Sequence, residues 1–389
     1  MPVPAAPFEF ATAGRIVFGR GLVTEAIPAA RQMGSRALLV TGKSGERTAD
    51  FEKSLADSGL QGVVVRIEGE PTVPAASHAA QLASDAGCDV VIALGGGSAI
   101  DAGKAIAAFL TNRSDPLDYL EVIGRGRALE HPPAPWIAIP TTAGTGAEVT
   151  RNAVLASPKH RLKVSLRSPL LLARAAIVDP ELTCCLPPQV TATSGLDALT
   201  QLMEAYVSVR ANPLTDSFCR DGLPRAARAL LRAFQDGSDM DARTDMAIAS
   251  LLSGLALANA GLGAVHGFAG PIGGMFTAPH GAVCAALLPH ATRVNIEALQ
   301  KRQPGGEALR RYETIAQTVT GNPHSGVGEL YRWLSELCRR LLIPGLRKYG
   351  VRDSHAAELC AGAARASSMK GNPIGLTNEE LKEILLRSL

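Results

Sequence analysis

Two histidines and an aspartate are the side chains of this sequence whose types and spacing could carry out chemistry. His266 and His280 each stand directly before a glycine, and Asp197 lies about seventy positions upstream of the first histidine. Two imidazoles and a carboxylate form the ligand set of a divalent transition metal, and three protein ligands leave a position for water or a substrate oxygen. Spacing alone leaves open the alternative that these are ordinary core histidines.

The position one helical turn after Asp197 is the place for a fourth ligand, because side chains four residues apart share one face of a helix. That position holds Gln201. Its amide carbonyl is a weaker ligand for iron or zinc than an imidazole. We therefore predict a metal site formed by Asp197, His266 and His280, with Gln201 or water in the fourth place.

A glycine-rich turn follows one of the apolar runs of the chain. The run at 89–94 leads directly into Gly95, Gly96, Gly97 and Ser98, where a helical pattern starts. Glycines let backbone N–H groups approach a ligand, and the N-terminus of a helix favours the negative charge of a pyrophosphate. The turn therefore predicts a phosphate site, with a tight turn that binds no ligand as the alternative.

A second polar turn, residues 140–146, follows another apolar run. Thr141, Thr142 and Thr145 supply hydroxyls that could bind ribose or phosphate at the same edge of the sheet, where ligands of α/β proteins collect. Asp101 follows the first turn and is also a cofactor candidate, although a carboxylate there suits the start of a helix and would repel a phosphate.

The end of the first strand bears on the choice of cofactor. An acidic residue after such a strand often binds ribose hydroxyls and repels a 2′-phosphate. Here Gly42 leaves room, and Lys43 and Ser44 could attract a phosphate. This favours NADP, or the use of both NAD and NADP, and a solvated loop lysine is the alternative.

The first half of the chain must position these turns. Short apolar runs alternate there with segments of helical spacing, which is typical of a parallel sheet covered by helices. The opening residues, 8–10 and 15–19, resemble two extended pieces that form a hairpin beside the sheet. We predict strands at 37–41, 62–67, 89–94, 136–140 and 176–179, and helices at 47–58, 75–86 and 100–110.

The second half must position the histidines, and its pattern is helical from Pro188 onward. We therefore predict an α/β dinucleotide-binding domain at 1–183 and an all-α metal-binding and catalytic domain at 184–389. The segment 300–327 gives the weakest pattern. Helices are expected at 189–209, 213–234, 241–260, 281–294, 328–342 and 377–388.

Composition excludes several classes of partner. The 389 residues carry a formal net charge of +3 without a basic block, and aromatic residues make up 4%. Nucleic acid and an anionic membrane are therefore poor candidates for the main partner. Seven cysteines without a C-x-x-C motif favour reduced thiols. The first residues show no secretory signal and no apolar run reaches the length of a membrane span, so we expect a cytoplasmic protein.

The motifs together resemble those of the iron-containing (group III) alcohol dehydrogenases, in the superfamily of glycerol dehydrogenase, maleylacetate reductase and dehydroquinate synthase. They are spread in order over almost the whole chain. They are GGGSAIDAGK (95–104), PTTAGTGAEVT (140–150), the Lys163-Val164-Ser165 region, DPELT (179–183), TSGLDALTQ (193–201), VHGFAGPIGG (265–274), PHG (279–281) and Gly371-Asn372-Pro373.

The resemblance implies an NAD(P)-dependent enzyme that interconverts an alcohol and an aldehyde or ketone, with a divalent metal, iron or zinc, polarising the substrate oxygen. It implies catalytic and metal-binding roles for Asp197, His266 and His280, and an association as a homo-oligomer, most simply a dimer. The residues that it implies for nicotinamide dinucleotide binding are Gly95, Gly96, Gly97, Ser98, Thr141, Thr142 and Lys163.

Two positions depart from the family pattern. The alcohol dehydrogenases of the family usually carry histidine at the position of Gln201, and often a further histidine at the position of Gly270. Glycerol dehydrogenases are similar to the three-ligand arrangement that remains here. The expected site is therefore a three-ligand site whose metal is weakly held.

Two alternatives to the alcohol dehydrogenase reading stay open. A maleylacetate-reductase-like enzyme would act on a carboxylate substrate, bound by Arg151 and Lys163, with or without metal, although the adjacent histidines usual in those enzymes are absent. A non-redox relative, similar to dehydroquinate synthase, is the second. Phe268 and Ser368 are candidates for the lining of the substrate pocket.

Overall fold

Six parallel strands form the sheet of the first half of the chain. The computed structural model describes residues 7–45, 48–160, 162–184 and 186–389. The sheet has the order β1-β8-β5-β4-β2-β3, and each neighbouring pair is parallel. Every residue of the central strands β4 and β5 is buried, as expected for strands covered on both faces. The strands are Ile16–Phe18 (β1), Ala37–Gly42 (β2), Gln61–Ile67 (β3), Val90–Gly95 (β4), Trp136–Pro140 (β5) and Ala175–Val178 (β8).

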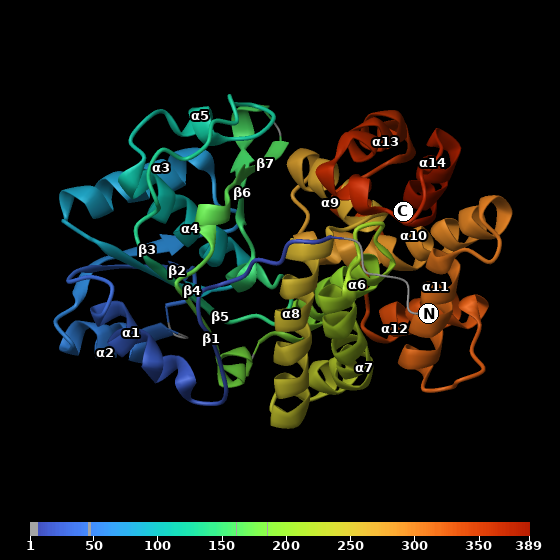
Figure 1. Ribbon diagram of the computed structural model, residues 1–389, viewed down its shortest axis with the longest axis horizontal. Helices are drawn as coiled ribbons and strands as arrows, with labels where there is room; N and C mark the ends of the chain where they lie inside the picture. Colours follow the sequence, from blue (N-terminus) through green and yellow to red (C-terminus); the bar gives the residue numbers. More distant parts are fainter. Residues whose placement is uncertain (1–6, 46–47, 161, 185) are drawn as a thin grey trace. The chain divides into compact units, whose positions relative to one another are not determined.

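Helices cover both faces of this sheet. Figure 1 shows α3 and α4 on one face and α1 and α2 on the other. The connection after β2 leads to β3, whereas the connection after β4 leads to β5 on the opposite side. The strand order therefore reverses between β2 and β4, which is where α/β sheets bind ligands. The helices are Ala26–Arg31 (α1), Ala49–Asp57 (α2), Val73–Asp85 (α3), Gly97–Thr111 (α4) and Pro116–Tyr119 (α5).

The predicted N-terminal hairpin is wrong. Residues 8–10 form no strand, and β1 pairs in parallel with β8, not with a preceding strand. The reason is that the ring of Phe10 packs on Phe218, with ring centroids 5.6 Å apart, while β1 completes the edge of the parallel sheet. The structure has an antiparallel pair elsewhere, Asn152–Ser157 (β6) with Leu162–Arg167 (β7).

The second half of the chain is helical, so the predicted fold class is confirmed for both halves. Its helices enclose a core made mostly of Ala, Leu, Val and Ile side chains. They are Pro188–Val207 (α6), Pro213–Gln235 (α7), Met240–Ala260 (α8), Ala264–Met275 (α9), His280–Arg302 (α10), Glu307–Thr320 (α11), Val327–Arg340 (α12), Ala356–Arg365 (α13) and Asn378–Arg387 (α14).

Three of these helices were not expected. Helix α11 falls in the segment with the weakest pattern, and α13 is short. Helix α9 contains four glycines and Pro271, which sequence rules assign to turns. At one of these glycines, Gly267, an added Cβ would lie 2.8 Å from Cε of Met369, so that the end of this flexible side chain would have to move.

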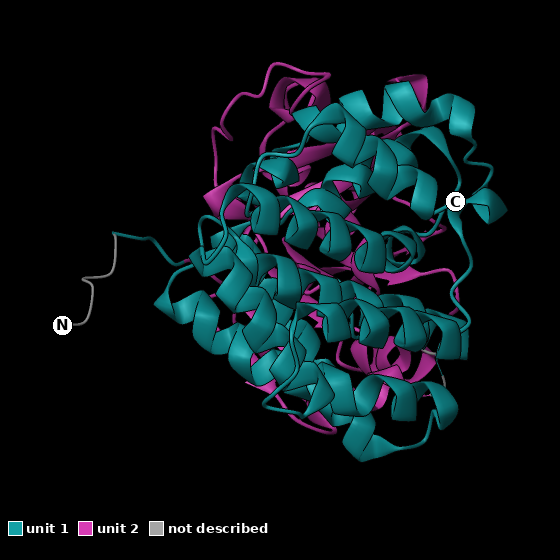
Figure 2. Cartoon of the chain, turned by 90° about the vertical axis from the view of Figure 1, so that its right-hand side faces the viewer, with its two compact units in different colours: residues 1–10, 143–145, 185–389 teal, residues 11–142, 146–184 magenta. Residues whose placement is uncertain are grey.

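The chain divides into two compact units, coloured separately in Figure 2. The α/β unit contains residues 11–142 and 146–184. The helical unit contains residues 1–10, 143–145 and 185–389. Arg47, the first residue of a predicted helix, and Cys185 lie outside the described residues. No single helix of the described chain is long and apolar enough to cross a membrane. Helices α8 and α9 together have the length and apolar composition of a membrane span, but they meet at an angle of 96°.

Candidate metal centre and dinucleotide site

Three helices of the helical unit bring the predicted metal ligands together. Asp197 lies in the middle of α6, His266 in the first turn of α9, and His280 is the first residue of α10. Oδ1 of Asp197 is 3.3 Å from Nε2 of His266 and 3.6 Å from Nε2 of His280. A fourth group, the thiol of Cys284, belongs to the same cluster, and the four ligand atoms all lie within 4.8 Å of one another.

The close contact between α10 and α6 explains how His280 reaches Asp197. A Cβ at position 281 would lie 2.5 Å from the carbonyl oxygen of Thr193, so only glycine lets the start of α10 approach α6 this closely. The carboxylate of Asp197 is 1% exposed, whereas the side chain of His280 is 36% exposed. The cluster is therefore anchored in the core and accessible at His280.

Glu204 orients His266 from behind. Its Oε2 lies 2.6 Å from Nδ1 of His266, and its Oε1 accepts a hydrogen bond of 2.7 Å from the N–H of Val265. A carboxylate can only accept, so Nδ1 carries the proton and Nε2 faces Asp197. This carboxylate–imidazole arrangement is typical of metal-bound histidines, because it fixes the ring and raises the basicity of the free nitrogen.

Opposite charges stabilise one another in this buried cluster. The neighbouring thiolate of Cys284, followed by Asp197, raises the pKa of His280 to about 9, although burial opposes the shift. Burial would raise the pKa of Asp197 and of Cys284, but the positive histidines outweigh it and lower both values. Protons on the imidazoles thus balance the anionic groups, and a divalent cation would take their place.

Gln201 lies one turn after Asp197 on α6 and is buried. Its Oε1 accepts a hydrogen bond of 2.6 Å from the hydroxyl of Ser253 on α8. The carbonyl oxygen that could have joined the metal ligands is thus held by a different partner. Its role as a ligand stays a prediction.

The predicted phosphate site lies at the carboxyl ends of β2, β4 and β5 in the α/β unit. Gly95 of β4 pairs with Pro140 of β5, and the N–H of Thr141 donates to the carbonyl of Gly95 at 2.9 Å. Gly42 ends β2, which is paired with β4. The structure therefore brings Gly42, the glycine turn and the Thr141–Thr142 segment to one edge, where the strand order reverses.

Helix α4 begins at this edge and suits an anion. Gly96 is its N-cap, and no side chain among the described residues caps this N-terminus. The backbone of Gly96 lies beside Thr142, where an added Cβ would be 3.4 Å from Cγ2 and in ordinary van der Waals contact. Free N–H groups of Gly97 and Ser98 at the positive end of a helix dipole form a site for phosphate oxygens.

Three cofactor candidates have other surroundings. Oδ2 of Asp101 accepts a hydrogen bond of 3.1 Å from the N–H of Val154 on β6. The ammonium of Lys163 lies 2.8 Å from Oε1 of Glu70, which forms a close ion pair. Thr145 belongs to the helical unit, unlike the other candidates.

Comparison with known proteins identifies the family. The model of the iron-containing alcohol dehydrogenases matches residues 13–180, and that of the C-terminal part of the Fe-containing alcohol dehydrogenase family matches residues 191–389. The chain belongs to the iron-containing alcohol dehydrogenase family. The expectation of an oxidoreductase of alcohols and aldehydes is thereby confirmed.

Relatives in this family align over nearly the whole chain. Long-chain-alcohol dehydrogenase 1 of Geobacillus thermodenitrificans is 34% identical over 95% of both chains. The 1,3-propanediol dehydrogenase of Klebsiella pneumoniae is 38% identical over 90% of both. A solved 1,3-propanediol oxidoreductase has a TM-score of 0.89 at 30% identity, with 99% of this chain and 100% of that chain covered. Sulfoacetaldehyde reductase from Bifidobacterium kashiwanohense, solved in complex with NAD+, has a TM-score of 0.86 at 28% identity, with 98% and 99% covered.

Sequence reasoning missed two groups of this dehydrogenase's candidate metal centre, Cys284 and Glu204. Cys284 follows His280 by four residues, the spacing of two ligands on one helix face, and so was detectable. Glu204 follows Asp197 by two turns on the same face of α6. A contact between Glu204 and His266, which are 62 residues apart, requires the tertiary structure.

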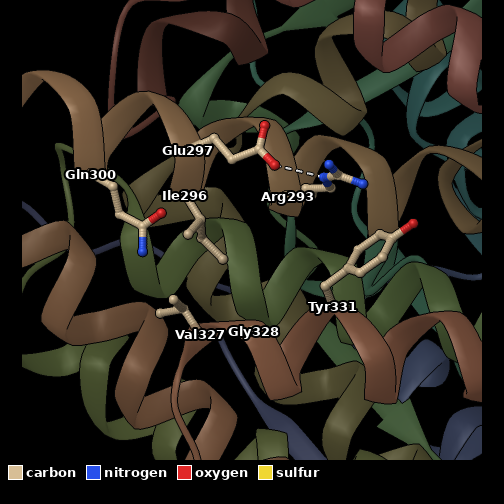
Figure 3. Close-up of a pocket in the computed structure, with 7 residues that line it drawn as sticks. All are labelled: Arg293, Ile296, Glu297, Gln300, Val327, Gly328 and Tyr331. Atoms are coloured by element: carbon tan, nitrogen blue, oxygen red, sulfur yellow. Dashed lines mark hydrogen bonds and ion pairs between the residues drawn. The ribbon is translucent and has the colours of Figure 1, made fainter.

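A surface pocket lies apart from this chemistry (Figure 3). It is lined by the middle of α10, with Arg293 and Glu297 paired at 2.7 Å, and by the start of α12 with Tyr331. Arg293 lies thirteen residues after His280 along α10, which is about 20 Å at 1.5 Å per residue. The pocket therefore does not belong to the metal centre.

Proposed function

We propose that the chain catalyses reversible hydride transfer between a small alcohol and NAD or NADP, with a divalent metal held by Asp197, His266 and His280. The observation that carries the metal part is the convergence of these three ligand atoms in a buried cluster. The donor set of one carboxylate and two imidazoles fits a divalent transition metal. When bound, the cation supplies Lewis-acid polarisation of the substrate oxygen, and the nicotinamide supplies the hydride acceptor.

The residues of the chain have separate tasks in this proposal. Asp197 supplies the negative charge that holds the cation, and Glu204 keeps the proton of His266 on Nδ1 so that Nε2 is free to bind. The turn from Gly95 to Ser98 binds the pyrophosphate through backbone N–H groups. Thr141 and Thr142 supply hydroxyls beside that turn.

The test uses the purified full chain, stripped with a chelator and reloaded with Fe²⁺ or Zn²⁺. Absorbance of the reduced nicotinamide is followed with a panel of alcohols and aldehydes that includes 1,3-propanediol, because relatives are named for it. We expect turnover that requires metal and that His280→Ala abolishes. If the stripped enzyme and His280→Ala were both as active as the metal-loaded parent enzyme, the metal would have no role in the reaction.

Finer parts of the proposal concern the cofactor, the metal and the assembly. Use of NADP is supported by Lys43, which follows β2. Its ammonium forms an exposed ion pair with Glu68 at 3.2 Å, and a pair of this kind is a weak competitor for a phosphate. Zinc as an alternative to iron and a homodimer are proposed from the family resemblance, and a cytoplasmic location is proposed from the cysteine pattern, which favours reduced thiols. A kinetic comparison of NADH with NADPH, metal analysis and light scattering test them.

The maleylacetate-reductase-like alternative is less well supported. It requires free positive charge for a second carboxylate, and the ammonium of Lys163 is already paired with Glu70. Reduction of maleylacetate beside simple aldehydes would decide between the two substrates.

A further inference from the structure

The thiol of Cys284 occupies a position in the metal centre that the first three ligands do not explain. Cys284 lies one turn after His280 on α10 and is fully buried. Its Sγ lies 3.7 Å from Nε2 of His280 and 3.8 Å from Nε2 of His266. The sulfur therefore faces the same nitrogens that face Asp197.

The distances between these atoms match the edges of a tetrahedral coordination shell. With metal–nitrogen and metal–oxygen bonds of about 2.0–2.2 Å and a metal–sulfur bond of about 2.3 Å, neighbouring ligand atoms lie roughly 3.3–3.7 Å apart. The observed edges are 3.3 and 3.6 Å from Asp197 and 3.7 and 3.8 Å from Cys284. Four of the six edges of such a shell are thus close to the expected lengths, with Cys284 in the place of a fourth protein ligand. The substrate oxygen would then bind as a fifth ligand, as catalytic zinc sites can expand to five.

Gln201 is the competing fourth ligand, and its contacts are less suitable. Its carbonyl oxygen accepts the hydrogen bond from Ser253, which already uses one of its two lone pairs. A thiolate is also a stronger donor than an amide for zinc and similar metals. Both chemistry and geometry favour sulfur over the amide.

We propose that Cys284 is the fourth protein ligand of the metal, which gives the centre one oxygen, two nitrogen and one sulfur donors. This inference rests on the proposed function, because it takes Asp197, His266 and His280 as the other ligands. On binding, a metal–sulfur bond forms from the thiolate of Cys284, and the protons that the two imidazoles carried on Nε2 pass to the solvent. A soft sulfur donor makes the centre select zinc more strongly than a site of oxygen and nitrogen alone.

Spectroscopy of the unmodified protein gives the decisive measurement. The full chain is stripped, loaded with Zn²⁺ and examined by X-ray absorption, where we expect one sulfur neighbour at about 2.3 Å. The Co²⁺-loaded protein should show a sulfur-to-metal charge-transfer band in the near ultraviolet. Neither readout depends on activity, and neither requires a variant that folds.

Variants give an independent measurement by competition with a zinc-binding dye. We expect Cys284→Ser to lose the charge-transfer band. We expect Cys284→Ala to bind Zn²⁺ at least about tenfold more weakly, because even the loss of a group that only hydrogen-bonds to a metal ligand weakens binding by this factor. Cys219→Ala removes another buried thiol of the helical unit, outside the cluster, and should change neither quantity.

The outcomes separate this inference from the proposed function. A zinc-loaded protein whose neighbours are only nitrogen and oxygen overturns the role of Cys284 and leaves the metal proposal intact. A protein that binds neither Zn²⁺ nor Co²⁺ overturns both. A sulfur signal that persists in Cys284→Ser also refutes the assignment.

Discussion

Glu204 determines which nitrogen of His266 is available to the candidate metal centre. Its two oxygens accept from Nδ1 of His266 and from the backbone N–H of Val265. Because each oxygen accepts a hydrogen bond, the carboxylate of Glu204 cannot rotate without breaking one of them. The orientation of a proposed metal ligand thus depends on a carboxylate that is not itself a proposed ligand.

We expect Glu204→Gln to weaken Zn²⁺ binding about tenfold to a hundredfold. The amide has one acceptor for two N–H donors, and its NH2 group must then face either the ring or Val265. Dye competition measures the affinity, and circular dichroism checks the fold. Glu297→Gln, on the exposed face of α10, is the control and should bind zinc like the parent. Unchanged affinity in Glu204→Gln would contradict the orienting role.

Helix α4 shows which elements sequence patterns predict. The buried runs of β4 and β5 and the helix after the glycine turn were predictable, because burial on both faces gives continuous apolar runs. The hairpin β6–β7 was missed although its burial alternates, since β7 carries Lys163 and Arg167 and forms no continuous apolar run. Its place on α4 is set by Lys104, whose buried ammonium donates to the carbonyl of Asn152 at 2.9 Å. Long-range contacts of this kind are absent from local patterns.

Gly103 tests the packing of α4 on the sheet. A Cβ there would lie 2.5 Å from Cβ of Ala93, so we expect Gly103→Ala to lower the free energy of unfolding by about 1–3 kcal/mol through overpacking. In Gly328→Ala a Cβ meets nothing within 4 Å on α12, and the higher helix propensity of alanine should raise stability by up to about 1 kcal/mol. Urea unfolding measures both. If the two substitutions changed the free energy of unfolding equally, the residues around Ala93 would have moved to accommodate the added Cβ without cost.

Glu148, between the second polar turn and β6, predicts a pH dependence of stability. Burial raises its pKa to about 7, although Lys104 attracts its charge. The folded state therefore favours the protonated form. This contribution is complete below the unfolded pKa of 4.5 and is lost as the pH rises through about 7.

Glu148→Gln should remove this dependence. Near pH 5 the variant and the parent should have similar free energies of unfolding, and by pH 8 the variant should be more stable by up to about 3 kcal/mol, at about 1.4 kcal/mol for each pKa unit. Urea midpoints across this pH range measure the difference. A difference that does not change with pH would refute the raised pKa of Glu148.

The two candidate binding sites lie in separate units of the molecule. The metal cluster lies on α6, α9 and α10 of the helical unit, and the glycine turn lies in the α/β unit. Both sites had sequence motifs, whereas the membership of residues 143–145 in the helical unit had none. These three residues belong to the helical unit because they pack against segments that are distant in the sequence.

Hydrogen exchange should reveal this separation. Because binding stabilises the region that it orders, we expect Zn²⁺ to slow exchange mainly in α6, α9 and the start of α10. NADH should slow exchange mainly at the turn from β4 to α4. Mass spectrometry of peptides from the full chain measures both, and His280→Ala should lose only the zinc effect. Protection by NADH that is absent from 95–100 would contradict the proposed phosphate site.

Two segments from the first half of the chain belong to the helical unit, and this has a consequence for the order of folding. Phe10 leaves the ribosome first, but its partner Phe218 on α7 follows about 200 residues later. A Cβ at Gly144 would lie 2.6 Å from Cβ of Ser194, so this segment too waits for α6 before it can dock. During synthesis the α/β unit can assemble first. The two early segments that belong to the helical unit, which contain Phe10 and Gly144, remain undocked until its helices have been made. A fragment that begins at residue 185 would lack both segments, so the helical unit is complete only in the full chain.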